Sequence, residues 1–365
     1  MGGMWGNELK LSLFGESHGP GIGIVLDGLP SGLAIDMQQV GREMARRAPG
    51  RDRLSTARRE ADAVQITSGL YRGRTTGTPL CALIQNGDTK SEDYEQLADL
   101  MRPGHADYPG YVRYKGFNDP RGGGHFSGRL TAPIVFAGAV CKQALAPYGV
   151  RVGAHIQCIA GICDDALDPV CVDAPLLAQL WEKEFPVLND QKGEEMQAAI
   201  AQAMRDGDSV GGIVECAVVG VPAGIGQPFF DSVESTLAHL LFAIPGVKGV
   251  QFGLGFAMAE RRGSACNDAY YYDEAGDVKM RTNHSGGILG GITSGMPIVC
   301  AVAMRPTASI KREQQTISLQ KRCEAPLAVG GRHDPCIVKR ALPVVEAMAA
   351  MAVYEQMKEA QACRI

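Results

Sequence analysis

Hydrophobic and polar positions along the chain follow two periods, one typical of strands and one typical of helices. Short Val- and Ile-rich runs bounded by Gly or Pro predict strands at 8–14, 22–27, 62–67, 79–85, 150–159, 211–219, 249–258 and 297–304. Helical spacing predicts helices at 36–47, 128–146, 173–184, 192–205, 231–243 and 337–358. The segment 128–146 carries Ala, Val and Gly on almost every side, which predicts a buried helix.

The predicted strands come in pairs between the helices rather than in strict alternation with them. This order favours an α+β fold with antiparallel sheets over a doubly wound parallel sheet. A strand followed by G-x-P-x-G and a helix start occurs at 23–36 and again at 213–228. This repeated pattern indicates either two similar halves around a common helical layer or two ordinary turns with Pro and Gly in preferred places. No linker-like stretch separates domains, so a single domain over 1–365 is expected.

Composition narrows the class of protein. The chain has 365 residues, 45% of them hydrophobic, and a net charge of −4, which fits an ordinary soluble protein and gives no sign of nucleic-acid binding. It has no apolar run of about 18 residues and no recognisable signal peptide, so neither a membrane span nor secretion is expected. Eleven cysteines without a C-x-x-C pair predict reduced, mostly buried thiols in the cytoplasm. Two pairs could ligate a metal, Cys158 with Cys163 and His333 with Asp334; the second lacks a third ligand nearby in sequence, and no metal is expected.

The stretch Gly15-Glu16-Ser17-His18-Gly19 fits G-x-S-x-G, the nucleophile elbow of serine hydrolases. An elbow needs a strand, a sharp turn and then a helix. Here Pro20, further glycines and a strand pattern follow, so the hydrolase interpretation is disfavoured. His18 is the more interesting residue, because glycine neighbours leave an imidazole room to face a ligand and its charge changes near neutral pH. A structural histidine at a turn is the alternative.

Arginines are concentrated in a few segments of this acidic chain. Seven of them fall within 42–60, where Pro49-Gly50 interrupts the helix and places Arg53 on a loop. The guanidinium fork grips carboxylate or phosphate with two hydrogen bonds. A solvated helix end explains Arg46 and Arg47 equally well, but not the loop arginines. Further Gly- or Pro-rich turns carry Arg102, His105, Ser127, Arg129, Arg305, Thr307, Ser309, Arg332 and Asp334.

These turns predict a polyanion pocket with one or two acid–base imidazoles. The free N–H groups where a helix opens after Ser127 would also favour an anion. We expect the mutual repulsion of the converging arginines to be relieved only when a ligand binds. Asp334 has a purely structural alternative, because Asp followed by Pro335 is a good N-cap and first residue for the C-terminal helix.

Taken together, the motifs resemble the chorismate synthase family over nearly the whole chain. The three longest are GESHGPGIGIVLDGLP near the start, GGGHFSGRLTAPIVFAGAV in the middle and RHDPCIVKRALPVVEAM at the end. RRAPG, RPGHADY, PGVKGVQFG and NHSGGILGGITSG agree with the family in order and spacing. Each motif alone is weak, but their recurrence in register is specific.

The resemblance implies a lyase of the shikimate pathway, which leads to the aromatic amino acids. Members of the family convert 5-enolpyruvylshikimate 3-phosphate to chorismate and phosphate by anti-1,4-elimination, and they require reduced FMN although the reaction has no net redox change. The resemblance also implies a β-α-β sandwich with antiparallel sheets around a central helical layer, and a homotetramer. A non-catalytic flavin- or anion-binding protein on the same scaffold is the alternative.

The resemblance also implies roles for individual residues. His18 is expected to protonate the departing phosphate, His105 to keep the reduced flavin correctly protonated, and Asp334 to relay the abstracted proton beside flavin N5. The expected substrate-binding residues are Ser17, Arg47, Arg53, Arg102, Arg129 and Arg332. The expected FMN contacts are His125, Phe126, Ser127, Pro245, Gly246, Gly290, Arg305, Pro306, Thr307, Ala308, Ser309 and Arg332. In members that reduce their own flavin, the positions of Arg47 and Arg53 are linked to NADPH.

The chain departs from the family pattern at 125–129, where many members read R-S-S-A-R and this chain reads HFSGR. His125 is expected to replace an arginine only partly and in a pH-dependent way, and Phe126 to stack on or shield a ring. Ala48 stands where many members carry a further arginine, and Pro245 removes one backbone donor. No large insertion is visible, so a separate flavin reductase is expected rather than reduction by NADPH on this chain.

Overall fold

The computed structural model describes residues 2–50, 62–87, 99–330 and 333–362. Most of its strands belong to two five-stranded sheets in which every neighbouring pair is antiparallel. The first sheet has the order β1-β2-β3-β7-β4 and consists of Met4–Trp5 (β1), Lys10–Gly15 (β2), Gly21–Asp27 (β3), Leu80–Gln85 (β7) and Val64–Ser68 (β4). The second has the order β11-β16-β10-β8-β9 and consists of Val247–Phe252 (β11), Ile298–Met304 (β16), Gly212–Val219 (β10), Arg151–Ile159 (β8) and Ile162–Cys163 (β9).

Helices and small hairpins complete the described part of the chain. The helices are Met37–Arg47 (α1), Asp107–Arg113 (α2), Thr131–Leu145 (α3), Ala174–Glu182 (α4), Asp190–Arg205 (α5), Val233–Phe242 (α6) and Val338–Ala362 (α7). The hairpins pair Leu70–Tyr71 (β5) with Arg74–Thr75 (β6), Tyr270–Tyr272 (β12) with Val278–Met280 (β13), Ile288–Leu289 (β14) with Ile292–Thr293 (β15), and Gln314–Ser318 (β17) with Cys323–Leu327 (β18).

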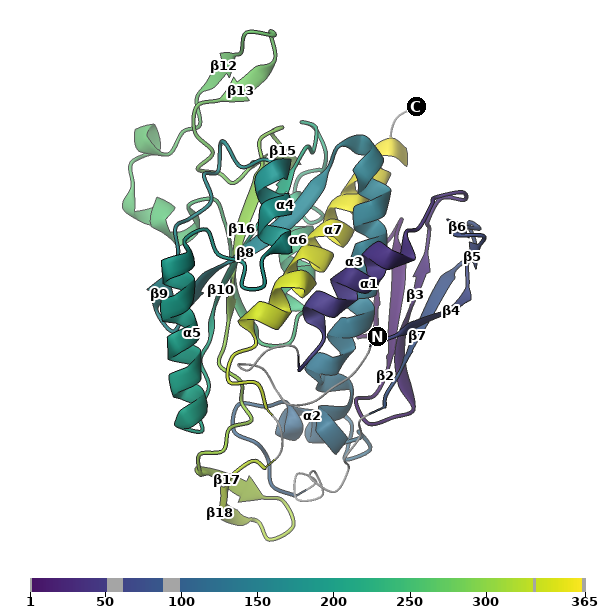
Figure 1. The fold of residues 1–365 in the computed structure, drawn as a ribbon, viewed down its shortest axis with the longest axis vertical. Helices are drawn as coiled ribbons and strands as arrows, with labels where there is room; N and C mark the ends of the chain where they lie inside the picture. The colour runs from purple at the N-terminus through teal and green to yellow at the C-terminus, as the bar shows by residue number, and fades with distance from the viewer. Residues whose placement is uncertain (1, 51–61, 88–98, 331–332, 363–365) are drawn as a thin grey trace.

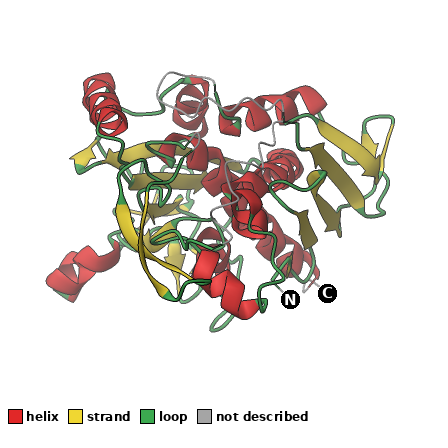
Figure 2. Ribbon diagram, turned by 90° about the horizontal axis from the view of Figure 1, so that it is seen from below, coloured by secondary structure: helices red, strands yellow, loops and turns green. Residues whose placement is uncertain are grey.

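Long helices lie between the two sheets (Figures 1 and 2). Helices α3 and α7 pack against each other, α3 contacts β3 and β7 of the first sheet, and α7 contacts β8 and β10 of the second. The two helices approach closely: a Cβ on Gly138 would lie 2.2 Å from the Cβ of Ala347. The stretch Gly128–Tyr148 is long and apolar enough to cross a membrane, but 78% of its apolar part is buried inside the protein. The prediction of a buried helix at 128–146 is therefore confirmed.

A buried ion-pair network joins the helices of this layer. The carboxylate of Glu346 on α7 accepts hydrogen bonds from Arg46 at 2.7 and 2.8 Å and from Lys142 at 2.6 Å. Burial acts to raise the pKa of Glu346, but the attraction of Arg46 and Lys142 outweighs it and lowers the pKa to about 2. The carboxylate is thus ionised inside the core because two cations reach it.

The two sheets differ in how their faces are covered. Strands β10 and β16 are almost wholly buried, since α7 packs on one face of the second sheet and a smaller cluster including Leu177 and Leu180 of α4 covers the other. Strand β4 of the first sheet alternates between partly buried and exposed positions. A sheet buried on both faces reads as a continuous apolar run, which explains the strong strand signals at 211–219 and 297–304.

All eight predicted strands and all six predicted helices are present, and an α+β fold with antiparallel sheets is confirmed. One strand was drawn too long: β11 ends at Phe252, and Gly253 with φ +52° turns the chain into a 3₁₀ segment, Gly255–Glu260. Helix α2 was missed, because its sequence contains Pro109 and Gly110. Proline is tolerated there because it lies in the first helical turn, where no backbone donor is needed.

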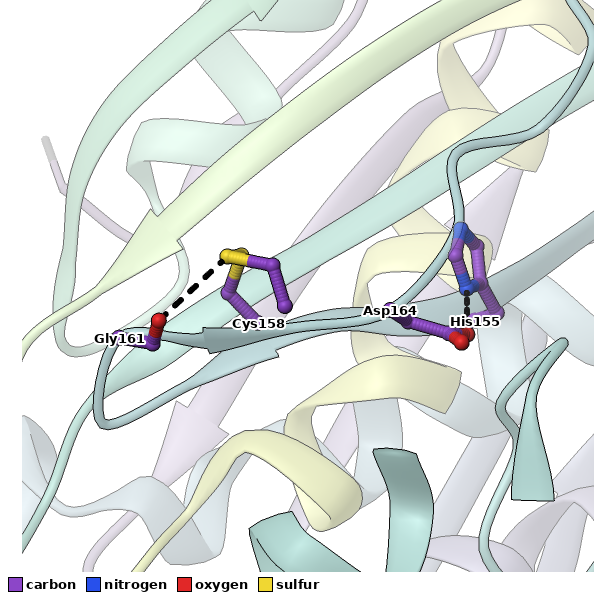
Figure 3. Close-up of a disulfide and its surroundings, with 5 residues drawn as sticks. His155, Cys158, Gly161 and Asp164 are labelled. Carbon is purple, nitrogen blue, oxygen red and sulfur yellow. Dashed lines mark hydrogen bonds and ion pairs between the residues drawn. A yellow bond between two sulfur atoms is a disulfide. The ribbon is translucent and has the colours of Figure 1, made fainter. Parts of the chain in front are cut away.

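The expectation that all cysteines are reduced is wrong for one pair. Cys158 and Cys163 face each other across the β8–β9 hairpin and form a disulfide (Figure 3). A two-residue turn through Ala160 and Gly161, both at positive φ, brings their Cα atoms to 4.1 Å. The expectation of burial also holds only in part. Of the free cysteines described, Cys141, Cys216, Cys300 and Cys336 are buried, Cys81 and Cys266 half-buried, and Cys171 and Cys323 exposed; Cys363 lies outside the described residues.

A fully buried histidine lies on the same hairpin. His155 contacts Asp164 through Nδ1 at 3.2 Å and Glu215 through Nε2 at 2.7 Å (Figure 3 labels the first pair). Burial acts to lower the pKa of His155, but the hydrogen bonds to Asp164 and Glu215 raise it overall. The group ties β8, β10 and the segment after β9 together.

Candidate functional site

Three glycines, Gly122 to Gly124, lie close to the two candidate histidines. All three have positive φ, at +59°, +83° and +51°. A Cβ on Gly122 would lie 2.1 Å from the His18 ring, and one on Gly123 would lie 3.2 Å from Cε1 of His105. Only glycine combines this backbone conformation with so close an approach. The first and second family motifs therefore meet at this triplet, and both imidazoles come close to its backbone.

Two hydrogen bonds hold this junction in place. The backbone N–H of Ser17 donates to the Gly124 carbonyl at 3.2 Å, and Nδ1 of His125 lies 2.9 Å from the Gly15 carbonyl oxygen. Ser17 and His18 are buried. The Ser17 hydroxyl has no hydrogen-bond partner among the described residues. A buried donor of this kind needs a partner, and a ligand can supply it.

Two buried arginines from separate elements share one carboxylate. Arg47 ends α1, Arg129 lies in the turn before α3, and both contact Asp62. The Arg47–Asp62 distance is 2.8 Å. Burial lowers the pKa of Arg47 to about 10, with help from Arg340 and Arg129 and against the attraction of Asp62. Burial acts to raise the pKa of Asp62, but the two arginines lower it overall.

A second carboxylate orients the third arginine and the second histidine. Asp107, the first residue of α2, binds Nε and Nη2 of Arg102 at 2.7 Å each and Nδ1 of His105 at 2.6 Å. Burial opposes ionisation of Asp107, but the hydrogen bonds from Arg102 and His105 hold its pKa well below the ordinary value. The sequence motif contained Asp107, and reasoning from the sequence singled out only its two partners.

These groups surround a cavity of about 640 Å³. A volume of this size is typical of sites for small molecules and cofactors. Its lining includes most of the residues expected from the sequence, namely Arg47, Arg102, His105, His125, Phe126, Ser127, Arg129, Pro245, Gly246, Arg305, Pro306, Thr307, Ala308, Ser309 and Asp334. His18 and Ser17 do not line it; they contact Gly122, which does. Gly290 lies exposed in the β14–β15 turn, away from this lining, and Arg53 and Arg332 lie outside the described residues.

Asp334 does not cap the C-terminal helix, so that structural alternative is wrong. Helix α7 begins at Val338, four residues later, and the Asp334 carboxylate instead pairs with Arg340 in the first turn of α7. Nε of Arg340 also donates to the Arg47 carbonyl at 3.1 Å. Asp334 therefore stays at the cavity wall. Nearby, burial is the main cause that lowers the pKa of His333, which keeps this imidazole neutral at higher acidity than usual.

The internal carboxylates correct one expectation about the arginines. Without a ligand, the repulsion among Arg47, Arg102 and Arg129 is already offset in part, because Asp62 pairs with Arg47 and Arg129 and Asp107 pairs with Arg102. Asp334 pairs in the same way with Arg340. Sequence reasoning missed Asp62 and Arg340, because neither lies in a Gly-rich turn. The only sign of either residue in the sequence is a charged side chain close to an apolar run.

The variant loop at 125–129 takes a definite conformation. His125 is exposed, and Phe126 packs over Gly110 of α2 and lies 6.2 Å from the Tyr114 ring. Ser127 accepts a hydrogen bond from the Arg129 backbone N–H at 3.3 Å and opens the turn before α3 as expected. Phe126 thus has a protein partner for one side of its ring.

Comparison with known proteins gives the family. Residues 9–357 match the family model described as chorismate synthase. The chain is 46% identical over 357 residues to a chorismate synthase of Pyrococcus abyssi, covering 97% of each chain, and 41% identical over 363 residues to one of Synechocystis, covering 99% of each. A solved structure, described as a crystal structure of chorismate synthase, matches with a TM-score of 0.76 at 27% identity, covering 98% of this chain and 93% of that one. By sequence and by fold, then, the chain belongs to the chorismate synthase family.

Proposed function

We propose that the cavity beside Gly122–Gly124 is the active site at which this lyase eliminates phosphate from 5-enolpyruvylshikimate 3-phosphate to give chorismate. The observation that carries the proposal is the close approach of His18 to Gly122 and of His105 to the neighbouring Gly123, beside three buried arginines. A substrate with two carboxylates and a phosphate suits that charge, and an elimination suits two positioned imidazoles. The alternative, a non-catalytic binding protein, explains the arginines but does not explain why two histidines lie beside them.

The cavity residues fit FMN by their chemistry. The Thr307 hydroxyl is buried and has no hydrogen-bond partner among the described residues, and it lies beside Arg305 and Ser309 in a loop suited to a phosphate. Phe242, Ile244, Pro245 and Ile337 add apolar wall suited to a planar ring. We assign the FMN contacts in this cavity to His125, Phe126, Ser127, Pro245, Gly246 and Arg305 to Ser309, together with Arg332; Gly290, which lies away from the lining, is not assigned to it. When bound, reduced FMN supplies electron density that helps the phosphate leave.

The chain's own residues bind the substrate and move protons. Arg47, Arg102 and Arg129, with Arg53, Arg332 and Ser17, hold its anionic groups and so fix its orientation. His18 donates a proton to the departing phosphate oxygen. His105, fixed through Nδ1 by Asp107, keeps the reduced flavin in the required protonation state. The Asp334 carboxylate, positioned by Arg340, helps to relay the proton removed from the substrate.

The wider organisation follows the family. We propose one domain over 1–365 with a β-α-β sandwich and two similar halves, supported by β3 and β10, which are each the middle strand of a five-stranded sheet and are each followed by a Gly-Pro loop and a helix. We also propose a homotetramer in the cytoplasm. A separate reductase would supply reduced FMN, with NADPH binding at Arg47 and Arg53 as the alternative.

An anaerobic assay with substrate and chemically reduced FMN tests the proposal. Chorismate should form without NADPH, and addition of NADPH to oxidised FMN should not replace the chemical reductant. His18→Ala and His105→Ala should each lower turnover by ~100-fold or more, as expected for a lost acid–base group. Normal turnover in either variant would refute the role given to that histidine. Absence of chorismate, with FMN binding still tightened by substrate, would favour the non-catalytic alternative.

A further inference from the structure

Asp62 is an unusual carboxylate that no family role assigned above explains. It lies just before β4, is only 4% exposed, and has a φ of +48°. Burial of a charge and a left-handed backbone at a residue other than glycine are both unfavourable. Such a residue persists only where its surroundings stabilise it, and here the stabilising groups are two arginines that line the cavity.

The two carboxylate oxygens are divided between the two arginines. Oδ2 accepts from Nη1 of Arg47 at 2.8 Å, and Oδ1 accepts from Nη1 of Arg129. The rest of each guanidinium is anchored elsewhere: Nε of Arg47 donates to Thr131 at 3.1 Å, and Nε of Arg129 donates to Asn86 at 3.1 Å. The carboxylate therefore sets the spacing between two forks that are each already fixed in orientation.

The carboxylate also changes how strongly the pair attracts an anion. Two buried guanidiniums would present a charge of +2 to any small anion, whereas the group with Asp62 presents +1. It also uses one N–H of each fork. A single phosphate ion gains less from the group than it would from the two arginines alone. A larger substrate that also contacts Arg102 loses a smaller share of its electrostatic attraction, because Arg102 is paired with Asp107 and not with Asp62.

We propose that Asp62 is a specificity-determining positioning residue, an internal carboxylate that spaces Arg47 and Arg129 for the substrate and weakens their hold on free phosphate. The inference rests on the proposed function, in which phosphate is the product that must leave. Asp62 would then favour a multiply anionic substrate and ease product release.

The test compares Asp62→Asn with the wild-type protein. Inorganic phosphate should inhibit the variant at a concentration about tenfold lower, while the KM for substrate rises several-fold because the spacing of the arginines is lost. Loss of fold alone would not produce tighter phosphate binding. Glu195→Gln, which removes the carboxylate of an exposed pair with Lys192 on α5, is the matched control and should leave both constants unchanged.

Two further measurements distinguish failure of this inference from failure of the variant to fold and from failure of the proposed reaction. Asp62→Glu keeps the charge and serves if Asp62→Asn does not fold; its phosphate inhibition should stay near wild type while its KM rises. Calorimetric titration with inorganic phosphate needs no turnover, so it tests Asp62 even if the proposed reaction fails. Unchanged or weaker phosphate binding by folded Asp62→Asn would overturn the inference.

Discussion

Replacing Gly122 with alanine tests the arrangement of the two histidines directly. Two effects arise, and the structure separates them. At φ +59°, an alanine is strained by roughly 1–2 kcal/mol relative to glycine. In addition, its Cβ would lie 2.1 Å from the His18 ring, where carbon contacts normally lie at about 3.5–4.0 Å. The ring would have to move by more than 1 Å, and it is buried, with 8% of its surface exposed.

A displacement of that size should remove His18 from its position for proton transfer. We expect Gly122→Ala to lower turnover by ~100-fold or more, as for loss of an acid–base group. Gly73→Ala is the matched control, because Gly73 has a φ of +74° and nothing within 4 Å of its would-be Cβ. The control should lose only about 1–2 kcal/mol of unfolding free energy and keep its turnover.

Both variants should be assayed anaerobically with reduced FMN and unfolded with urea in parallel. Gly123→Ala adds an intermediate case, since its Cβ would lie 3.2 Å from His105, a contact that a small shift can relieve. Wild-type turnover in Gly122→Ala would refute the reasoning, because the loop would then accept a side chain without disturbing catalysis. Equal loss of turnover in the control would refute it too, since strain alone would explain the effect.

Three other predictions follow from the buried charges. Arg129→Lys should raise the KM for substrate despite equal charge, because lysine cannot reach Asp62 and Asn86 together and still hold an anion; wild-type affinity would contradict this bidentate role. Since the folded-state pKa of Glu346 is depressed to about 2, it should make stability rise with pH between about 2 and 4.5, and urea unfolding of Glu346→Gln should show a smaller rise than the wild type; equal slopes would count against the network. Since the pKa of His155 is raised, its contribution should be present below pH 6.5 and lost as pH rises through the raised value, a loss that unfolding of His155→Phe should not show.

The sequence predicted the elements well because their signals are local. The strand signals at 211–219 and 297–304 come from a sheet covered on both faces, and the signal at 128–146 comes from a helix packed against α7. Helix α2 and the Cys158–Cys163 disulfide were missed for the opposite reason. Proline and glycine in α2 obscure its helical pattern. The disulfide depends on a two-residue turn, which the spacing of the cysteines in the sequence does not reveal.

The sequence predicted the arginines, the two histidines and Asp334 of the site, but not the carboxylates of Asp62 and Asp107 that pair with the arginines. Gly-rich turns and clustered arginines mark a sequence visibly, whereas Asp62 is one acidic residue among 40 and gains its meaning only when folding brings Arg47 and Arg129 to it. The same holds for Arg340, which reaches Asp334 and the end of α1 only because α7 starts where it does. Pairing across distant segments is a property of the fold and leaves no local pattern.

This pairing bears on how the protein binds its substrate. A pocket of unpaired arginines would resist folding, since buried like charges repel and desolvation of each is costly. Here each of the buried arginines Arg47, Arg102 and Arg129 has an internal carboxylate partner before any ligand arrives. The substrate then binds to guanidinium groups that are already oriented and partly neutralised. The affinity should depend on how many forks one molecule reaches at once, and removal of an internal carboxylate should change the selectivity of the pocket more than its total charge would suggest.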